Sequence, residues 1–181
     1  METRKLVVIN GSYRDNGTTK KCLESVAERI RRKHRMGEVV WVSIPSNFRG
    51  CINCGLGKCV AGCRIADDFQ GIVDKLRGAS RVLIGTPVYL DFPSPKLLAL
   101  LSRLNCMAEP TQRKFFRGMK VHLHANGYCS GTKAAVGVLM NACEMLGFTI
   151  EGRSTTEYIE IWHDHKIRGG MPQDPRCLVK D

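Results

Sequence analysis

Residues 6–19 of the chain read LVVINGSYRDNGTT, and they are the strongest indication of how the chain folds. Its apolar start has the length and β-branched content of a buried strand that ends at Asn10. Gly11 and Gly17 then bracket a polar loop, because glycine lets the backbone turn tightly before a helix begins. Hydroxyl and guanidinium groups in and after the loop can bind an anion: Ser12, Arg14, Thr18 and Thr19. A strand that leads through such a loop into a helix N-terminus predicts a site for an anionic group.

The loop lacks the signatures of the common nucleotide-binding loops. Gly17-Thr18-Thr19 has no lysine where a triphosphate-binding loop requires one. The dinucleotide pattern Gly-x-Gly-x-x-Gly is absent too, and no acidic residue closes a second strand near residue 44. A single terminal phosphate is therefore the predicted ligand, and a glycine-rich turn that only caps a helix is the alternative.

Strand-like and helix-like patterns alternate along the chain, which predicts a parallel sheet flanked by helices. Strands are expected at residues 5–10, 39–44, 81–84 and 119–125, with a fifth from 148. Helices are expected at 18–34, after an N-cap at Asp67, from Ser94-Pro95 onward, and at 132–146. Residues 46–66 are rich in Gly and Cys, and this loop is long enough to suggest a function.

The composition fits one domain of 181 residues with 43% hydrophobic residues. No apolar run approaches the roughly 20 residues of a membrane helix, and no secretory signal is recognisable, so a cytoplasmic protein without membrane contact is expected. The nine cysteines then indicate reduced thiols, metal ligands or redox chemistry rather than a disulfide framework.

The formal net charge of +11 raises the possibility of nucleic-acid binding. Five of the cations crowd the end of the helix expected at 18–34, where cations complement the helix dipole: Arg29, Arg31, Arg32, Lys33 and Arg35. No nucleic-acid module or aromatic platform accompanies them, so nucleic acid is not the expected partner. The charge would instead attract a phosphorylated nicotinamide cofactor or another anionic substrate.

Three blocks of this sequence resemble the NADPH-dependent FMN reductase and iron-sulfur flavoprotein family. Residues 11–19 match the flavin-phosphate loop, Gly-Ser-x-Arg-x-x-Gly-x-Thr, and residues 85–89, GTPVY, match the loop beside the flavin ring. The third block is the cysteine segment that ends in Asp67-Asp68. The resemblance implies an α/β, flavodoxin-like three-layer sandwich with a five-stranded parallel sheet in the order 2-1-3-4-5. Residues 1–163 would form this FMN-binding domain, with the cysteine loop 46–66 inserted after the second strand, and 164–181 would be a C-terminal tail.

The resemblance also implies which residues contact FMN. The phosphate loop supplies Ser12, Arg14, Gly17, Thr18 and Thr19. The flavin ring would lie along Pro87, Val88, Tyr89, Leu90 and Asp91. A third loop supplies Asn126, Gly127, Tyr128 and Ser130. Asp91 stands where the family usually has glycine, which predicts a narrower and more acidic entrance to the ring site.

Cysteines at positions 51, 54, 59 and 63 form a second candidate centre. Four soft thiolates this close together can bind an iron-sulfur cluster or a zinc ion, and free or redox-active thiols are the remaining alternative. Family members with a cluster have Cys-x2-Cys-x2-Cys and a fourth cysteine before the Asp-Asp pair; here the third position is Gly57. We expect Cys51, Cys54, Cys59 and Cys63 to bind one [4Fe-4S] cluster, with zinc as the alternative. The other cysteines are expected in the core or at the surface: Cys22, Cys106, Cys129, Cys143 and Cys177.

Two further departures from the family bear on packing and assembly. Ser102-Arg103 replaces the usual Asp-Arg, which removes an acidic partner of Arg103. No amphipathic helix follows Trp162, so a partner subunit or residues 158–162 should cover one face of the sheet. A homodimer or homotetramer is therefore expected. His122 and His124 share a strand face, and packing or solvation is their expected role.

The resulting functional expectation is an FMN-dependent oxidoreductase. It would take electrons from NAD(P)H and pass them to a quinone, a flavin, a disulfide or a cysteine-bound iron-sulfur cluster. No catalytic general base is expected, because hydride transfer to a flavin needs none. The alternative is a non-enzymatic flavin and iron-sulfur electron carrier or redox sensor that acts with a protein partner. A third reading is a basic nucleic-acid binder that has lost its cofactor.

Overall fold

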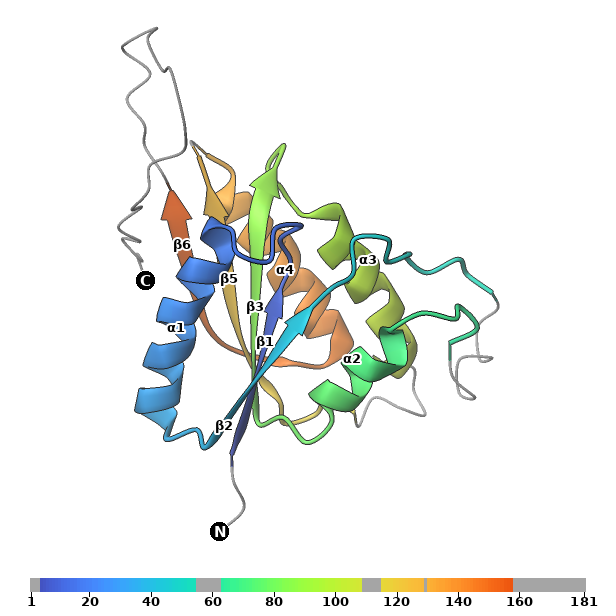
Figure 1. Ribbon diagram of the computed structural model, residues 1–181, viewed down its shortest axis with the longest axis horizontal. Helices are drawn as coiled ribbons and strands as arrows, with labels where there is room; N and C mark the ends of the chain where they lie inside the picture. Colours follow the sequence, from blue (N-terminus) through green and yellow to red (C-terminus); the bar gives the residue numbers. More distant parts are fainter. Residues whose placement is uncertain (1–3, 55–62, 109–114, 129, 158–181) are drawn as a thin grey trace, which may run out of the picture.

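A computed structural model describes residues 4–54, 63–108, 115–128 and 130–157 of the chain. Strands and helices alternate through these residues, as the sequence predicts (Figure 1). The elements are β1 (Lys5–Asn10), α1 (Thr18–His34), β2 (Glu38–Ser43), α2 (Phe69–Leu76), β3 (Arg81–Tyr89), β4 (Phe92–Pro93), α3 (Pro95–Leu104), the 3-10 turn η2 (Asn105–Ala108), β5 (Lys120–Gly127), α4 (Thr132–Leu146) and β6 (Thr149–Glu157).

The five long strands form a parallel sheet in the order β2-β1-β3-β5-β6. This confirms the predicted order 2-1-3-4-5 of a flavodoxin-like sheet. The predicted number of strands was wrong, because the short strand β4 pairs antiparallel with the end of β3 and makes the sheet six-stranded. The sequence pattern missed it because β3 runs on to Tyr89 and then reverses through only two residues, Leu90 and Asp91.

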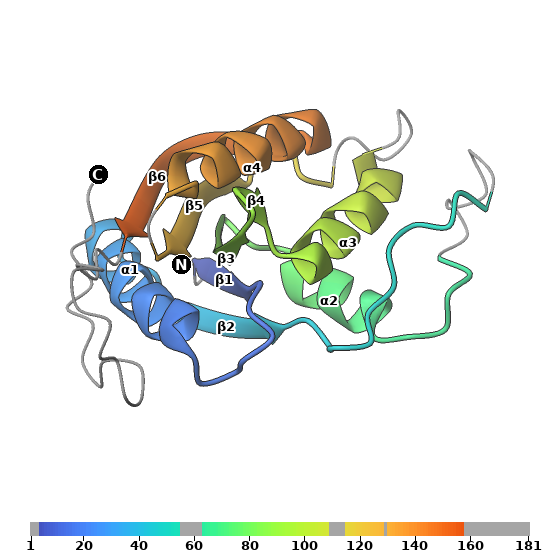
Figure 2. The same ribbon diagram turned by 90° about the horizontal axis from the view of Figure 1, so that it is seen from above.

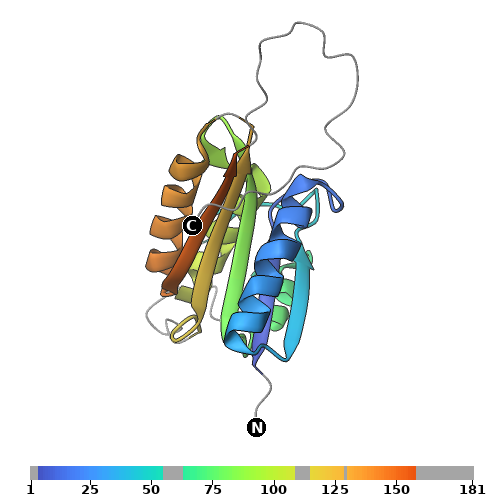
Figure 3. The ribbon, with the colours of Figure 1, turned by 90° about the vertical axis from the view of Figure 1, so that its left-hand side faces the viewer.

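Helices cover both faces of the sheet, which gives three layers (Figures 2 and 3). On one face, α1 packs Leu23, Val26 and Ile30 against β1 and β3. On the other face, α2, α3 and α4 enclose the larger core, whose strand residues include Ile9 and Ile84. The buried helix residues recur every three or four positions, so their spacing in the sequence fixes which side of each helix meets the sheet.

Helix boundaries follow the capping residues. Ser94 is the N-cap of α3, where its side chain accepts a hydrogen bond from the Leu97 amide, and Gly147 ends α4 with a φ of 96°. The predicted N-cap of α2 was wrong by one residue: Asp68 occupies that position. Asp67 still contributes, because its Oδ1 accepts a hydrogen bond from the Phe69 amide at 3.1 Å.

In the described residues, α1 alone covers its face of the sheet, and a groove of about 360 Å³ remains beside it. Arg29 and Lys33 of α1 line this groove opposite His122 and Arg153 of the sheet. The residues expected to cover this face, 158–162, lie outside the described residues. The expectation of a dimer or tetramer stays a prediction. None of the helices in the described ranges is long and apolar enough to cross a membrane.

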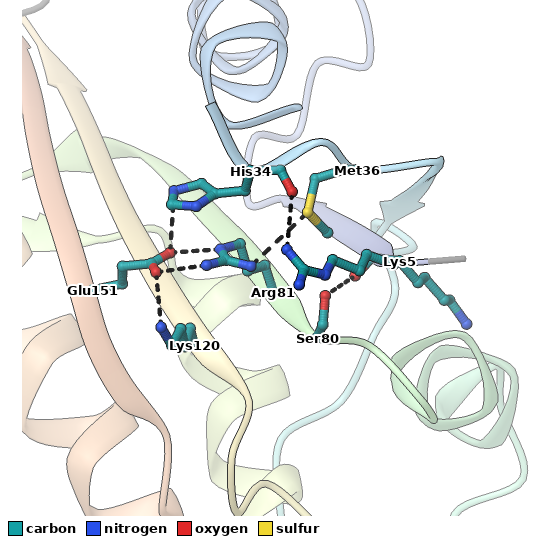
Figure 4. Close-up of polar contacts among 8 residues, drawn as sticks. Lys5, His34, Met36, Ser80, Arg81, Lys120 and Glu151 are labelled. Atoms are coloured by element: carbon teal, nitrogen blue, oxygen red, sulfur yellow. Dashed lines mark hydrogen bonds and ion pairs between the residues drawn. The ribbon is translucent and has the colours of Figure 1, made fainter. Parts of the chain in front are cut away.

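One carboxylate joins four elements at the amino-terminal end of the sheet (Figure 4). Glu151 of β6 accepts two hydrogen bonds from the Arg81 guanidinium of β3, at 2.7 and 2.8 Å. Lys120 of β5 lies 3.3 Å from the same carboxylate, and His34 at the end of α1 lies 3.7 Å away. The hydrogen bond from Arg81 is the main reason that the pKa of Glu151 falls from 4.5 to about 2.

The Glu151 network predicts a specific acid sensitivity. The ionised carboxylate is stabilised in the folded protein, so this contribution is present above pH 4.5 and is lost as the pH falls towards about 2. Replacing Glu151 by Gln should lower the free energy of unfolding by about 1 kcal/mol at neutral pH. The difference between variant and wild type should shrink as the pH falls through that range, as measured by urea denaturation at a series of pH values.

The matched control is Glu24→Gln, which removes an exposed carboxylate from α1. It should leave the pH dependence of stability as in the wild type. A constant difference between wild type and Glu151→Gln at every pH would contradict the assigned role of the carboxylate.

Candidate functional site

The polar loop after β1 begins at a close contact between two strands. The Gly11 amide donates a hydrogen bond to the Gly85 carbonyl at 2.7 Å. A Cβ atom on Gly11 would lie 2.7 Å from that same oxygen, so no side chain fits there. Neither Gly11 nor Gly17 has a positive φ. The expectation of a tight turn made possible by glycine dihedrals was therefore wrong for this loop, and Gly11 is required for close approach instead.

Hydrogen bonds within the loop keep its backbone curled above the sheet. The Ser12 amide donates to Asn10 Oδ1 at 3.0 Å, and the Arg14 amide donates to Ser12 Oγ at 3.1 Å. The Gly17 amide then donates to the Arg14 carbonyl at 3.3 Å. Ser12 is buried, whereas Arg14 is exposed at the rim of the loop.

The N-terminus of α1 opens into this loop without a side-chain cap. Gly17 is its N-cap residue and provides no side-chain oxygen, and no acidic residue lies in the first turn. Thr18 is half-buried and Thr19 is buried at this end. The first amides of an α-helix have no partners within the helix, and its dipole favours negative charge there. A bound anion would supply the missing acceptors, so the residues present fit the predicted phosphate.

The residues expected as a loop beside the flavin ring lie mostly in strand β3, which corrects the predicted end of that strand. Pro87, Val88 and Tyr89 are its last three residues, and Leu90 and Asp91 form the two-residue turn to β4. Both turn residues have positive φ, 49° and 66°. A hairpin of this kind prefers Asn-Gly, because a β-carbon is strained there. The side chain of Leu90, at the tip of the hairpin, is 95% exposed.

The third expected segment reaches the same end of the sheet (Figure 1). Asn126 and Gly127 are the last residues of β5, and Asn126 pairs with Pro87 of β3. Gly131, with a φ of 80°, packs so closely on the hairpin that its Cβ would lie within 2.8 Å of Asp91 Cα. The hairpin and the third segment are therefore in contact.

Two polar atoms at this end of the sheet are buried without a hydrogen-bond partner. They are Oδ1 of Asn126 and Oγ1 of Thr156, which stand side by side in the register of β5 and β6. A buried polar atom without a partner costs about 1–3 kcal/mol, so such atoms are uncommon unless a ligand or water completes them. A ligand at the carboxyl ends of the strands could provide the missing partners.

Exposed large hydrophobic side chains gather at this end. The described residues include seven such side chains, and five of them belong to the three converging segments: Tyr13, Tyr89, Leu90, Phe92 and Tyr128. We call these five residues, all aromatic except Leu90, the aromatic rim. Ser130 is also exposed in this region. An apolar patch beside open amides suits a ligand that carries a phosphate and a flat aromatic ring.

Ser94 links the loop after β1 to β3 and to α3. Its hydroxyl donates to the Gly11 carbonyl at 2.6 Å, and its amide donates to Thr86 Oγ1 at 2.8 Å. The first turn of α3 adds Lys96, whose Nζ donates to the Ile44 carbonyl at 2.7 Å and lies 5.1 Å from the centre of the Tyr13 ring. Burial lowers the pKa of Lys96. The sequence analysis identified Ser94 as a helix cap but did not predict its hydrogen bonds to Gly11 and Thr86.

The expected metal ligands are only partly within the described residues. Cys51, Cys54 and Cys63 line one small cavity beside α3, whereas Cys59 lies outside the described residues. In the ranges that the structure describes, no three His, Cys, Asp or Glu side chains form a preassembled metal-binding group. Cys106 of η2 also lines this cavity, and the sequence analysis did not predict that position.

The interaction partners of Arg103 come from distant parts of the sequence. Its guanidinium pairs with Asp67 and donates to Cys63 Sγ at 3.1 Å. It also lies over the rings of Phe48 and Phe69, at 4.7 and 4.2 Å. The hydrogen bond from Arg103 lowers the pKa of Asp67. The neighbouring Ser102 accepts a hydrogen bond from the Cys51 amide at 3.1 Å, so the unusual Ser-Arg pair anchors the cysteine segment.

The two histidines of β5 have the structural role that was predicted. Nε2 of His122 and Nδ1 of His124 each lie 3.0 Å from Ser154 Oγ. Burial is the main reason that the pKa of His124 is lowered to about 4. His124 is therefore neutral at physiological pH.

Comparison with known proteins connects this geometry to a family. The model of the NADPH-dependent FMN reductase family matches residues 4–156. An iron-sulfur flavoprotein of Methanocaldococcus jannaschii is 28% identical over 99 residues, which are 55% of this chain and 51% of that protein. The chain thus matches only about half the length of this curated relative.

Two solved structures show the same fold at low sequence identity. RosB, with bound 8-demethyl-8-formylriboflavin-5'-phosphate, superposes with a TM-score of 0.65 at 17% identity, over 86% of this chain and 65% of RosB. An azoreductase from Bacillus anthracis superposes with a TM-score of 0.63 at 12% identity, over 86% and 87% of the two chains.

The contacts of Ser94 predict the cost of removing its hydroxyl. Ser94→Ala removes the cap of α3 and leaves the buried Gly11 carbonyl without its donor. The free energy of unfolding should fall by about 1–2 kcal/mol, measured by urea denaturation. Ser25→Ala, which removes an exposed hydroxyl from α1, is the control and should change stability little. Equal stability of Ser94→Ala and wild type would contradict this assignment.

Proposed function

The chain belongs to the NADPH-dependent FMN reductase family, and from that premise we propose that it is an FMN-dependent oxidoreductase that takes electrons from NADH or NADPH. The observation that carries the proposal is the meeting of an uncapped helix N-terminus with the aromatic rim at one end of the sheet. Few ligands combine a phosphate with a flat, amphipathic ring of this size, and FMN is one of them.

The first turn of α1 and the loop before it would hold the phosphate of FMN. The amides of Thr18 and Thr19 would donate to the phosphate oxygens, and the helix dipole would stabilise the negative charge. Ser12 Oγ already accepts a hydrogen bond from the Arg14 amide, so its own proton remains for donation. Arg14, exposed at the rim of the loop, would add a charge-assisted hydrogen bond.

The hairpin and the third segment would hold the ring. Pro87, Val88 and Tyr89 offer backbone and aromatic surface on one side, and Asn126 offers its buried, unpartnered Oδ1. The turn at Leu90 and Asp91 is kept in its strained conformation by contact with Gly131. Rigid placement of these groups would orient the ring and limit its contact with water.

Bound FMN would supply the redox chemistry, in which it receives a hydride equivalent from the nicotinamide and passes electrons on to an acceptor. The residues of the chain position the reactants, and no general base is required. The aromatic rim favours a flat aromatic acceptor, such as a quinone or a second flavin, over a disulfide, because Tyr89, Phe92 and Tyr128 can stack on it.

The cysteine-lined cavity supports a second candidate function, an electron carrier or redox sensor that works with a protein partner. The two functions differ in their electron donor. Steady oxidation of NAD(P)H by the purified protein with a quinone or flavin supports the enzyme. Reduction by ferredoxin or dithionite alone supports the carrier.

The phosphate contacts predict which variants lose FMN. Ser12→Ala and Arg14→Ala should each weaken FMN binding by about tenfold to a hundredfold, because each removes a hydrogen bond to a charged group. Both variants should bind riboflavin as the wild type does, since riboflavin lacks the phosphate. Titration of the flavin-free protein, followed by quenching of flavin fluorescence, measures both affinities.

Lys33→Ala is the matched control, because it removes a positive charge from the opposite end of α1. Its affinity for FMN should stay close to that of the wild type. A loss of riboflavin affinity as large as the loss of FMN affinity in the Ser12 and Arg14 variants would show that these residues do not contact the phosphate.

A further inference from the structure

The groove beside α1 lies in the amino-terminal half of the sheet, away from the candidate flavin site. Its volume is about 360 Å³, within the range of about 300–1,000 Å³ that is typical of small-molecule sites. Val26 and Ile30 of α1 are buried and give it an apolar floor. Arg29 and Lys33 of the same helix also line it and are exposed. The proposed flavin chemistry uses none of these residues.

We propose that this groove binds a phosphate group, either as inorganic phosphate or as the phosphate monoester of a small molecule such as a nucleotide. Arg29 and Lys33 make the charged contacts, and His34 and His122 lie beside them in the groove. The site is independent of FMN binding, because it uses neither the loop after β1 nor the aromatic rim.

The two cations of the groove are spaced to share one anion. Arg29 and Lys33 are four residues apart in α1, so their side chains lie on the same face, one turn from each other. The intervening arginines pair with Glu28 instead: Nε of Arg31 lies 2.7 Å and Nε of Arg32 lies 2.6 Å from its carboxylate. A guanidinium and an ammonium one turn apart can bind the same phosphate through charge-assisted hydrogen bonds.

The acidic residue in the groove does not cancel this charge. Glu151 is the only carboxylate among the described residues that line the groove. It accepts two hydrogen bonds from Arg81 and lies 3.3 Å from Lys120, neither of which lines the groove (Figure 4). These two cations outweigh its single negative charge. Arg29 and Lys33 therefore give the groove a net positive charge, which favours an anionic ligand.

The pKa of His34 reflects this positive environment. Burial is the main reason that this pKa is lowered. The charges of Arg81, Lys33 and Lys120 lower it too, whereas Glu151 acts in the opposite direction. A phosphate in the groove would favour the protonated ring and raise the pKa of His34.

The carbonyl groups at the end of α1 are engaged in ways that make the groove less hostile to an anion. Open carbonyls and the helix dipole place partial negative charge at a helix C-terminus. Here the Arg31 carbonyl accepts a hydrogen bond from the Met36 amide at 3.0 Å. The His34 carbonyl accepts one from the Arg4 guanidinium at 3.4 Å. Both acceptors are thus directed towards donors of the protein.

An irregularity in β6 shapes the wall opposite α1. Val121 pairs with Ile150 and His122 pairs with Gly152, so Glu151 is an extra residue that forms a β-bulge. A Cβ on Gly152 would lie 2.6 Å from Nδ1 of His122, so the missing side chain lets this ring lie against β6. Bulges often occur beside functional sites, where they redirect side chains.

The test titrates the protein with inorganic phosphate, with AMP and with adenosine, both loaded with FMN and free of flavin. Calorimetry measures affinity, and the NMR ring signals of His34 and His122 locate the binding in the groove. We expect phosphate and AMP to shift both ring signals and to raise the pKa of His34, and adenosine to leave them unchanged. Tighter binding of AMP than of phosphate would identify a monoester as the ligand, and equal or weaker binding would identify the free ion.

Arg29→Ala and Lys33→Ala should each weaken phosphate binding in the groove by about tenfold, because each removes a charge-assisted hydrogen bond. Both residues are exposed, so the variants should fold as the wild type does. The matched control is Lys75→Ala, which removes an exposed lysine from α2 on the other face of the sheet. It should bind phosphate as the wild type does.

The proposal is overturned if saturating phosphate and AMP leave both ring signals unmoved, or if adenosine shifts them as AMP does. It is also overturned if Arg29→Ala and Lys33→Ala keep wild-type affinity, or if Lys75→Ala loses as much affinity as Lys33→Ala. A DNA duplex that shifts these signals where phosphate and AMP do not would overturn it as well, and would indicate a nucleic-acid surface instead.

Discussion

The absence of side chains at Gly11 and Gly85 allows β1, β3 and α1 to pack closely against one another. A Cβ on Gly11 would lie 2.7 Å from the Gly85 carbonyl oxygen, and one on Gly85 would lie 2.3 Å from Leu23 of α1. Because neither is present, β1 stays paired with β3 up to its last residue, Asn10, which lies opposite Gly85, while α1 packs across both strands. The loop after β1 therefore leaves the sheet beside β3, which continues to the hairpin turn at Leu90 and Asp91.

The two ends of the sheet have different roles. At the amino-terminal end, the carboxylate of Glu151 in β6 pairs with charged or ionisable side chains of β3, β5 and α1 (Figure 4). At the carboxyl end, polar groups without partners and exposed aromatic rings remain beside the start of α1. The Glu151 ion pairs thus lie at one end, and the unpartnered atoms of Asn126 and Thr156 that a ligand could complete lie at the other. The cysteine cavity lies apart from both, against α3.

The sequence predicted the elements whose patterns are periodic and local. The bounds of α1 and α4 match the predicted ranges, and the order of the five long strands is confirmed. The hairpin was missed because Leu90 and Asp91 adopt a turn that their side chains disfavour, and contact with Gly131 provides the compensation. This contact joins residues that are far apart in the sequence, so no local sequence pattern predicts it.

The same limit applies to the candidate sites. The loop after β1 could be proposed as a phosphate site because its polar groups are contiguous, whereas the unpartnered atoms of Asn126 and Thr156 follow from strand pairing. Cys106 lies 43 residues after Cys63, and only the packing of η2 brings it to the cavity. The partners of Arg103, likewise, come from segments that precede it by 36 and 40 residues.

The central claim is that the N-terminus of α1 binds the phosphate of FMN. Backbone amide resonances recorded during a titration of the flavin-free protein with FMN, and separately with riboflavin, test it most directly. With FMN, the amides of Thr18 and Thr19 should shift strongly, whereas riboflavin should shift mainly the amides of the hairpin and the third segment. Unmoved α1 amides with saturating FMN, or equal shifts of these amides with riboflavin, would contradict the account.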